Sequence, residues 1–473
     1  MRRLRALAVA SLAIATTLTG STQVTADTRD KITINVWLND YPIPGYLAAR
    51  VKAAEDFNRL YPRYHVNVVP YDYTKLPADL SKAAKEGKHP TIANYYSNAV
   101  QVALDTGDRR GKPLFKSVEK AIGKRDHVLG QQNVLPDLVP AYRSYYTRRG
   151  DLTSMPTTAM TSLLFANTTV LAAAGITEVP RTWAALEAAC DAIAKLPDGP
   201  PHCATWANHN WFPQQAVLQQ DAPLANHGNG RFGRATRVDL DSAALRSYVS
   251  WLDGLHDKGH FLYTTNADQT WEGVFQAFGS QQVAFALSSA NTAGLFASMG
   301  QQGGFQTAAG RMPYNDAVPL SGNLVTGDSL WLADGLDKAT EDGALAFMLF
   351  LNNPDNAVAW HKSNHYLPMT RTAVRRLEAE GWFTANPADR IAIDQVNANT
   401  GTPAALGPVL GDFHGVQTAL TSAVHDVLVG GADPATRLRQ ADHEAQRHLS
   451  TYNAWCASGG QRHANCFRIY PLG

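Results

Sequence analysis

The sequence LTSMPTTAMTSLLFANTTVL, residues 152–171, decides how this chain is divided. Pro156 fixes its own φ and favours extended geometry at Met155, and the threonines that follow also favour extended backbone. The apolar run at 162–166 then has the character of a buried strand. We therefore expect the chain to leave one α/β lobe here and to enter a second lobe past a cleft.

Strands and helices alternate upstream of this segment. Residues 31–39 alternate apolar and polar side chains, a helical pattern follows from Leu47 to Leu60, and a second strand is expected at 65–69. This order predicts a largely parallel sheet, in which ligands bind beyond the carboxyl ends of the strands. The candidate site residues at such positions are Trp37, Asp40, Tyr41, Tyr73, Tyr95, Tyr96 and Ser97.

Bulk composition narrows the class of ligand. The 473 residues carry a net charge of +1 without a long basic block, which argues against a nucleic-acid partner. Hydrophobic residues make up 45% of the chain, which is enough for two or three domains that each have a hydrophobic core. A neutral or weakly polar small molecule suits this balance.

The N-terminus has the pattern of a secretory signal peptide. Three arginines precede an apolar run at 6–18, and the expected cleavage site follows Ala26. The alternative is a buried N-terminal helix. Residues 18–21, LTGS, resemble a bacterial lipobox, but Ser21 stands where the lipid-carrying cysteine would be. We expect an exported, extracytoplasmic protein that is released, or whose anchoring cysteine was lost or replaced.

The four cysteines are Cys190, Cys203, Cys456 and Cys466. An even number in an exported chain predicts disulfides. The pairing 190–203 with 456–466 closes two short loops and is one of three possible connectivities. A metal site is the alternative, but the sequence contains no CxxC motif.

Catalytic and cofactor-binding motifs are absent from the sequence. It contains no GxSxG, P-loop or HExxH motif, and no pair of carboxylates stands out as a glycosidase pair. Aromatic and amide residues are instead concentrated between Trp206 and Gln215. Trp faces stack on the CH faces of sugars, and amides bind their hydroxyls. Both tryptophans could be core residues, but we expect at least one of Trp206 and Trp211 in a cleft.

Six segments, taken in order, resemble the extracellular solute-binding proteins of ATP-binding-cassette (ABC) importers for sugars and glycerol phosphates. They cover nearly all of the chain beyond the signal peptide. They are residues 54–68, 180–183 (PRTW), 275–285 (FQAFGSQQVAF), 347–360 (FMLFLNNPDNAVAW), 366–368 and 419–434.

The resemblance implies an α/β, bilobal periplasmic-binding-protein fold of class II type, with two discontinuous lobes joined by a hinge. The expected boundaries are 1–26 for the signal peptide, 27–156 with about 289–340 for lobe 1, and 157–288 with about 341–473 for lobe 2. Such a protein closes on its solute and delivers it to the transmembrane subunits of an ABC permease. We expect a monomer that catalyses nothing and needs no cofactor.

The resemblance also places the ligand-binding loops. The expected ligand-binding residues are Asp40, Tyr41, Tyr96, Ser97, Thr158, Thr161, Trp206, Trp211, Ser288, Ser289, Gly327, Asp328 and Tyr366.

The ligand that this pattern favours is a neutral mono- or oligosaccharide, with an amino sugar as one form. Relatives that bind glycerol phosphates carry serines at Ala159 and Met160 and an arginine at Val409, whereas Arg371 offers a cation near Tyr366. A glycerol-3-phosphate or glycerophosphodiester ligand is therefore the first alternative, and a secreted glycoside hydrolase is the second.

Overall fold

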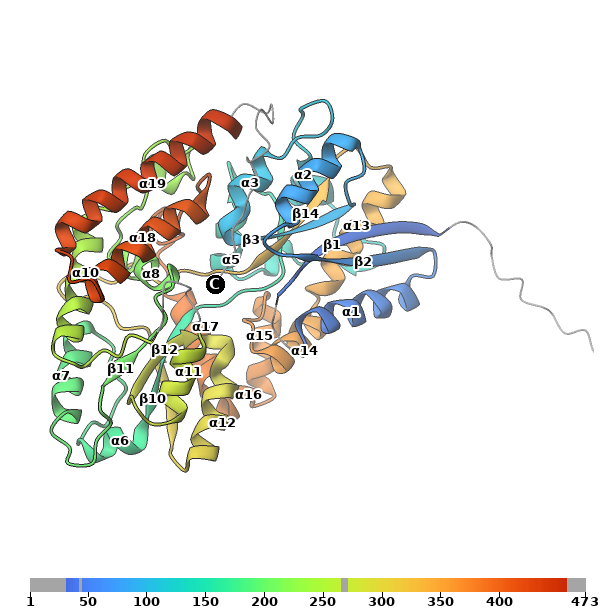
Figure 1. Ribbon diagram of the computed structural model, residues 1–473. Coiled ribbons are helices and arrows are strands. Elements are labelled where there is room, and N and C mark those ends of the chain that lie inside the picture. The colour runs from blue at the N-terminus through green and yellow to red at the C-terminus, as the bar shows by residue number, and fades with distance from the viewer. Residues whose placement is uncertain (1–30, 42–44, 265–270, 457–473) are drawn as a thin grey trace, which may run out of the picture.

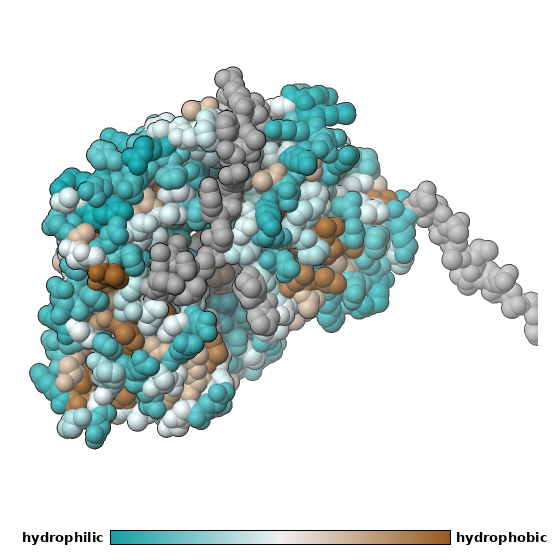
Figure 2. All heavy atoms as spheres, viewed as in Figure 1, coloured by the Kyte–Doolittle hydropathy of each residue, from teal (hydrophilic) through white to brown (hydrophobic). Residues whose placement is uncertain are grey.

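Two β-sheets, each covered by helices, form two lobes that meet in the middle of the molecule (Figure 1). The computed structural model describes residues 31–41, 45–264 and 271–456. The expected signal peptide and its lipobox-like stretch lie outside these residues. Within them, none of the helices has the length and apolar character of a membrane span, and the face in Figure 2 is mostly hydrophilic.

The first sheet has the strand order β2-β1-β3-β14-β4, and β9 also pairs with β14. In β1, the alternating side chains of Ile34, Val36 and Leu38 are buried, as the sequence pattern predicts. β1 runs parallel to β2 and β3, whereas β14 is antiparallel to β3. The strands are β1 (Ile32–Asp40), β2 (Tyr64–Asp72), β3 (Ile92–Tyr96), β4 (Phe115–Lys116), β9 (Met155–Pro156) and β14 (Asp328–Ala333).

Helices from both halves of the sequence cover this sheet. Phe57 of α1 packs against Phe347 and Phe350 of α13, with ring centroids 5.3 and 5.6 Å apart. The first lobe contains α1 (Tyr46–Leu60), α2 (Leu76–Glu86), η1 (Ser97–Ala99), α3 (Val100–Asp105), α4 (Val118–Ile122), η2 (Leu135–Asp137), α5 (Pro140–Tyr146), α13 (Lys338–Leu351), α14 (Pro354–Asn364), α15 (Arg371–Ala379), and the hairpins β5 (His127–Val128) with β6 (Gln131–Gln132) and β7 (Thr147–Arg148) with β8 (Asp151–Leu152).

The second sheet has the order β11-β12-β10-β13. Thr182 caps α7 by accepting a hydrogen bond from the Ala185 amide, as the sequence predicts. The second lobe contains α6 (Thr168–Ala173), α7 (Trp183–Ile193), α8 (Trp211–Gln219), α9 (Asn226–Asn229), α10 (Ala243–Asp257), α11 (Glu272–Gly279), η3 (Ala290–Thr292), α12 (Ala293–Gly303), α17 (Pro387–Asn397), α18 (Phe413–Leu428), α19 (Pro434–Cys456), β10 (Ser162–Asn167), β11 (Ala204–Thr205), β12 (Phe285–Ser289) and β13 (Thr307–Arg311).

Within the described residues, the chain crosses between the lobes three times. The first crossing lies within residues 152–171, since β9 belongs to the first sheet and β10 to the second. The second crossing leads into β14, and the third passes through α16 (Trp382–Ala385). The first two pair with each other, because Met160 and Thr326 exchange two backbone hydrogen bonds of 2.9 and 3.1 Å.

The expected boundaries after residue 288 do not match these pairings. Residues 289–340 were assigned to lobe 1, but β13 pairs antiparallel with β10 in the second sheet. Residues from 341 onward were assigned to lobe 2, but α13 packs against β1 in the first lobe. The loop after β12 is therefore not a crossing, because the chain stays in the second lobe until it reaches β14.

A disulfide joins Cys190 on α7 to Cys203, next to β11. This confirms the first expected pair. The second expected pair includes Cys466, which lies outside the described residues. Within the described residues, no group of three or more His, Cys, Asp or Glu side chains forms a candidate metal site.

Replacing Cys190 and Cys203 together by alanine should lower the free energy of unfolding by about 3 kcal/mol. The disulfide closes a loop of 13 residues, and its loss enlarges the unfolded ensemble. Both side chains are buried, so alanine keeps the site apolar. Urea unfolding of variant and wild type measures the difference, and a loss below about 1 kcal/mol contradicts this expectation.

Candidate functional site

A pocket between the two lobes is the candidate ligand site. It is bounded by the ends of β3, α5, α8 and α18 and by the second crossing. We call it the interlobe cleft. Its described lining residues are Tyr96, Ser97, Asn98, Tyr145, His209, Asn210, Trp211, Gln214, Leu324, Thr326, Pro408, Phe413 and Gln417.

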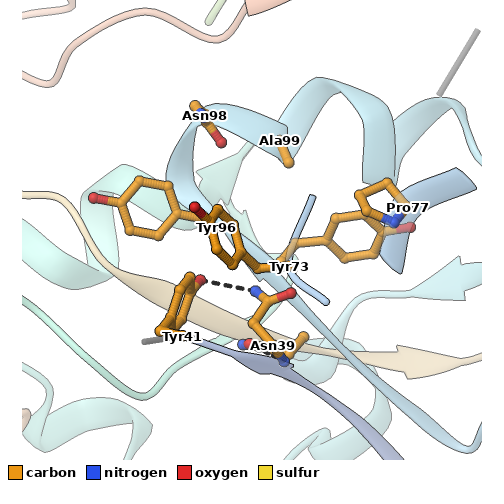
Figure 3. Close-up of a pocket in the computed structure, with 9 residues that line it drawn as sticks. Asn39, Tyr41, Tyr73, Pro77, Tyr96, Asn98 and Ala99 are labelled. Carbon is orange, nitrogen blue, oxygen red and sulfur yellow. Dashed lines mark hydrogen bonds between the residues drawn. The ribbon is translucent and has the colours of Figure 1, made fainter. Parts of the chain in front are cut away.

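The wall from the first lobe is built where β3 ends and η1 begins. The Tyr145 hydroxyl donates to the carbonyl oxygen of Ser97 at 3.1 Å, which holds this turn against α5. Tyr96 and Asn98 also line a neighbouring pocket in the first lobe, shown in Figure 3. There the Tyr41 ring lies 5.1 Å from Tyr73 and 6.3 Å from Tyr96. The carboxyl ends of β1, β2 and β3 therefore bring these three tyrosines together.

Asp328 holds Tyr41, a member of this cluster, in place. The hydroxyls of Tyr41 and Tyr46 each donate to one of its carboxylate oxygens at 2.7 Å. Only 2% of Asp328 is exposed, and this burial raises the pKa of its carboxyl group. Since each carboxylate oxygen accepts from a tyrosine hydroxyl, Asp328 orients Tyr41 and Tyr46.

The wall from the second lobe begins at the first turn of α8. The Gln214 side chain donates to Asn210 Oδ1 at 2.8 Å, and Trp211 is only 6% exposed. The buried indole N–H of Trp211 has no hydrogen-bond partner among the described residues, and neither has the buried Gln417 Oε1. An unpaired donor and an unpaired acceptor thus belong to residues that line one cleft, and buried polar atoms normally have partners.

His209 adds a neutral imidazole to this wall. Its Nδ1 accepts a hydrogen bond from the Trp211 amide at 3.2 Å, which leaves the proton on Nε2. Burial lowers the pKa of His209 to about 4. The described lining residues therefore include no charged side chain at neutral pH.

A family model described as bacterial extracellular solute-binding protein matches residues 52–390. The chain belongs to this family. It is the solute-binding component of an ABC importer, as the sequence resemblance implied.

Individual relatives bind different solutes. The chain is 26% identical over 415 residues to the sn-glycerol-3-phosphate-binding periplasmic protein UgpB of Pectobacterium atrosepticum, covering 84% of this chain and 89% of that protein. Among solved structures, the cyclic alpha-maltosyl-1,6-maltose binding protein of Arthrobacter globiformis has a TM-score of 0.71 at 17% identity, covering 89% of this chain and 100% of the other. UgpB of Mycobacterium tuberculosis, in complex with glycerophosphocholine, has a TM-score of 0.67 at 18% identity, covering 89% and 98%. The bilobal periplasmic-binding-protein fold is thereby confirmed.

Several residues that were expected to bind the ligand instead join the first crossing to the second. The Thr158 hydroxyl accepts from the Asp328 amide at 2.6 Å, and the Thr161 hydroxyl donates to the Leu324 carbonyl at 3.3 Å. Gly327 has a φ of +151°, and a Cβ there would lie 2.1 Å from the Thr158 carbonyl oxygen. Gly327 is therefore needed for the close approach of the two crossings.

The remaining expected residues divide between core, surface and cleft. Trp206 is a core residue whose indole N–H donates to the Tyr248 hydroxyl at 3.2 Å, whereas Asp40 is exposed. Tyr366 is buried and stacks on Trp360 at 5.5 Å. Ser288 and Ser289 end β12, both buried. Of the expected residues, Tyr96, Ser97 and Trp211 line the interlobe cleft together.

Sequence reasoning missed the contributions of Tyr145, Phe413 and Gln417 to the cleft. Tyr145 lies on α5, and the other two lie in the first turns of α18. Their neighbours follow the ordinary pattern of core helices, so the sequence carries no signal that separates them from core residues.

Replacing His209 by glutamine should reduce the loss of folding stability in acid. The unfolded chain binds a proton at this imidazole below about pH 6.5, while the folded protein binds it only below about pH 4. Stability from His209 is therefore lost as the pH falls through this window. Urea unfolding at pH 7 and pH 4.5 should show a smaller difference for the variant than for wild type.

His448 provides the control with the opposite sign. Its hydrogen bond with Asp412, at 2.8 Å, raises the pKa of His448, so its contribution is present at low pH and is lost as the pH rises. His448→Gln should therefore lose stability mainly below pH 6.5. Equal pH dependence in wild type and His209→Gln would show that His209 does not titrate in this window.

Proposed function

We propose that the protein captures a neutral carbohydrate, a mono- or oligosaccharide that includes amino sugars in N-acetylated form, in the interlobe cleft. The observation that carries this proposal is the unpaired Trp211 N–H together with the unpaired Gln417 Oε1. A sugar hydroxyl both donates and accepts, so one ligand can satisfy both groups. The aromatic rings of Tyr96, Tyr145 and Trp211 supply faces for the CH groups of a sugar.

The sequence relatives favour the glycerol-phosphate alternative, but the residues that line the cleft favour it less than a neutral carbohydrate. Phosphate recognition calls for an arginine fork or several donors. The described lining residues include no lysine or arginine. Arg371 instead donates to the Pro136 carbonyl oxygen and pairs with Asp137 at 3.7 Å. Val409, where the resemblance expects an arginine, is buried.

The protein delivers its solute to the transmembrane subunits of a permease outside the cytoplasm, acts as a monomer and releases the solute unchanged. No nucleic acid takes part. This proposal predicts that maltose-type or N-acetylglucosamine-type saccharides remain intact after incubation with the purified protein. Chromatographic detection of cleaved sugar would support the glycoside hydrolase alternative instead.

Isothermal titration calorimetry of protein refolded free of ligand should detect neutral mono- or disaccharides. sn-Glycerol 3-phosphate and glycerophosphocholine should bind at least about tenfold more weakly, a difference of about 1.4 kcal/mol. Tighter binding of either phosphate compound would overturn the proposal in favour of the glycerol-phosphate alternative.

Trp211→Ala should weaken binding of the same saccharide by more than about 1 kcal/mol, because it removes a buried aromatic anchor. Trp211→Phe keeps a ring but lacks the N–H, so its dissociation constant should lie between those of alanine and wild type. Trp206→Phe is the matched control: it lies in the core of the same lobe and should lower stability while leaving the dissociation constant unchanged. Equal affinity of Trp211→Ala and wild type removes Trp211 from the site.

A further inference from the structure

A set of side chains bridges the two lobes away from the three crossings. We call this set the interlobe clasp. It joins α3, α5 and β7 of the first lobe to the segment 230–234 and α19 of the second. Its members are Asp105, Tyr145 and Arg148 on one side, and Gly230, Arg231, Arg234 and Tyr452 on the other.

Two arginines make a reciprocal exchange in the clasp. Arg148 donates to the carbonyl oxygen of Gly230 at 3.0 Å, and Arg231 donates to the carbonyl oxygen of Tyr145 at 3.1 Å. The Arg231 guanidinium also lies 4.8 Å from the centre of the Tyr145 ring, which lines the cleft. An arginine side chain of each lobe thus binds a backbone carbonyl oxygen of the other lobe.

Arg231 is anchored firmly within its own lobe. Its Nε donates to the Gly407 carbonyl oxygen at 2.7 Å, and a second nitrogen donates to Leu406. Burial lowers its pKa to about 10, so the group remains charged at neutral pH. The contact with Tyr145 is therefore made by a side chain whose position is already fixed.

Asp105 is the buried centre of the clasp. Its carboxylate forms a two-pronged ion pair with Arg234 and accepts a hydrogen bond from the Tyr452 hydroxyl at 2.8 Å. The side chain of Asp105 is 8% exposed and that of Arg234 is 26% exposed. Breaking such a pair leaves a charge without its partner in a largely dry site, which costs more than breaking a surface pair.

The position of the clasp gives it a mechanical role. In Figure 1 the C-terminal end of α19 lies beside α3 at the top of the view, whereas the crossings pass through the middle. A rotation about the crossings that moves α19 away from α3 would break these contacts. None of these contacts includes a ligand, so they favour closure whether or not the cleft is filled.

We propose that the interlobe clasp is a ligand-independent closure latch that holds the lobes together and slows the release of bound solute. Ligand contacts and latch contacts then add in the closed state, while the open state has neither. Asp105 and Arg234 act on the ligand through lobe closure, since neither lines the described cleft.

The test measures lobe separation in ligand-free full-length protein by electron–electron double resonance. Spin labels are placed at Lys82→Cys on α2 and Arg447→Cys on α19, both exposed and in different lobes. Wild type should give a predominantly short distance. Asp105→Asn should shift the open-to-closed ratio by about tenfold toward longer distances, and Tyr452→Phe should shift it in the same direction by less.

The matched control is Asp342→Asn, which breaks a pair with Arg125 at 2.5 Å within the first lobe. It should leave the distance distribution as in wild type. The latch is overturned if Asp105→Asn and Tyr452→Phe both keep the wild-type distribution, or if the control shifts it equally. Arg234→Gln replaces Asp105→Asn if circular dichroism shows that the latter does not fold.

The distance measurement needs no ligand, so it is independent of the proposed carbohydrate. Where a saccharide binds, stopped-flow release from Asp105→Asn should be about tenfold faster than from wild type. A wild-type release rate in a variant whose ligand-free lobes are open would show that the latch does not govern release. Failure of every saccharide to bind would refute the carbohydrate proposal and leave the distance result standing.

Discussion

The close pairing of the first two crossings is the constraint on which the rest of the structure depends. Met160 and Thr326 exchange backbone hydrogen bonds, and Gly327 allows its neighbour strand to approach where any Cβ would collide with the Thr158 carbonyl. Because the two segments form one short ribbon, the lobes can rotate about it without separating. The next residue after this ribbon, Asp328, then sets the position of Tyr41 through a 2.7 Å hydrogen bond.

The chemistry of the cleft follows from what burial does to its polar groups. His209 is neutral because its pKa is lowered, and Asp328 is turned toward two tyrosine hydroxyls. The groups left for a ligand are amides, hydroxyls, an indole N–H and aromatic rings. Such a set recognises shape and hydroxyl geometry and depends little on charge. The opposing charges at Asp105 and Arg234 lie outside the cleft lining, where they join the lobes.

Local patterns in the sequence predicted local structure correctly. The proline–threonine segment does cross between the lobes, the alternation in β1 does bury one face, and Thr182 does cap α7. The family resemblance also predicted the bilobal fold. The strand alternation and the helix cap are determined by neighbouring residues in the sequence. The fold was predicted from the order of the segments.

Features that depend on distant contacts were not predictable in the same way. Trp206 and Trp211 lie in a stretch of the same composition, yet Trp206 packs in the core and Trp211 lines the interlobe cleft. Asp105 has its partners at residues 234 and 452, far from it in the sequence. The pairing of β13 with β10 joins segments about 145 residues apart, and no local pattern encodes it.

A solute held in the interlobe cleft contacts residues of both lobes. Hydrogen–deuterium exchange with and without a bound saccharide tests this most directly. We expect slower exchange on binding at 96–98 in the first lobe, at 209–214 and 413–417 in the second, and at 324–326 in the second crossing. Slower exchange in one lobe only, or unchanged exchange in all four segments, would contradict binding between the lobes.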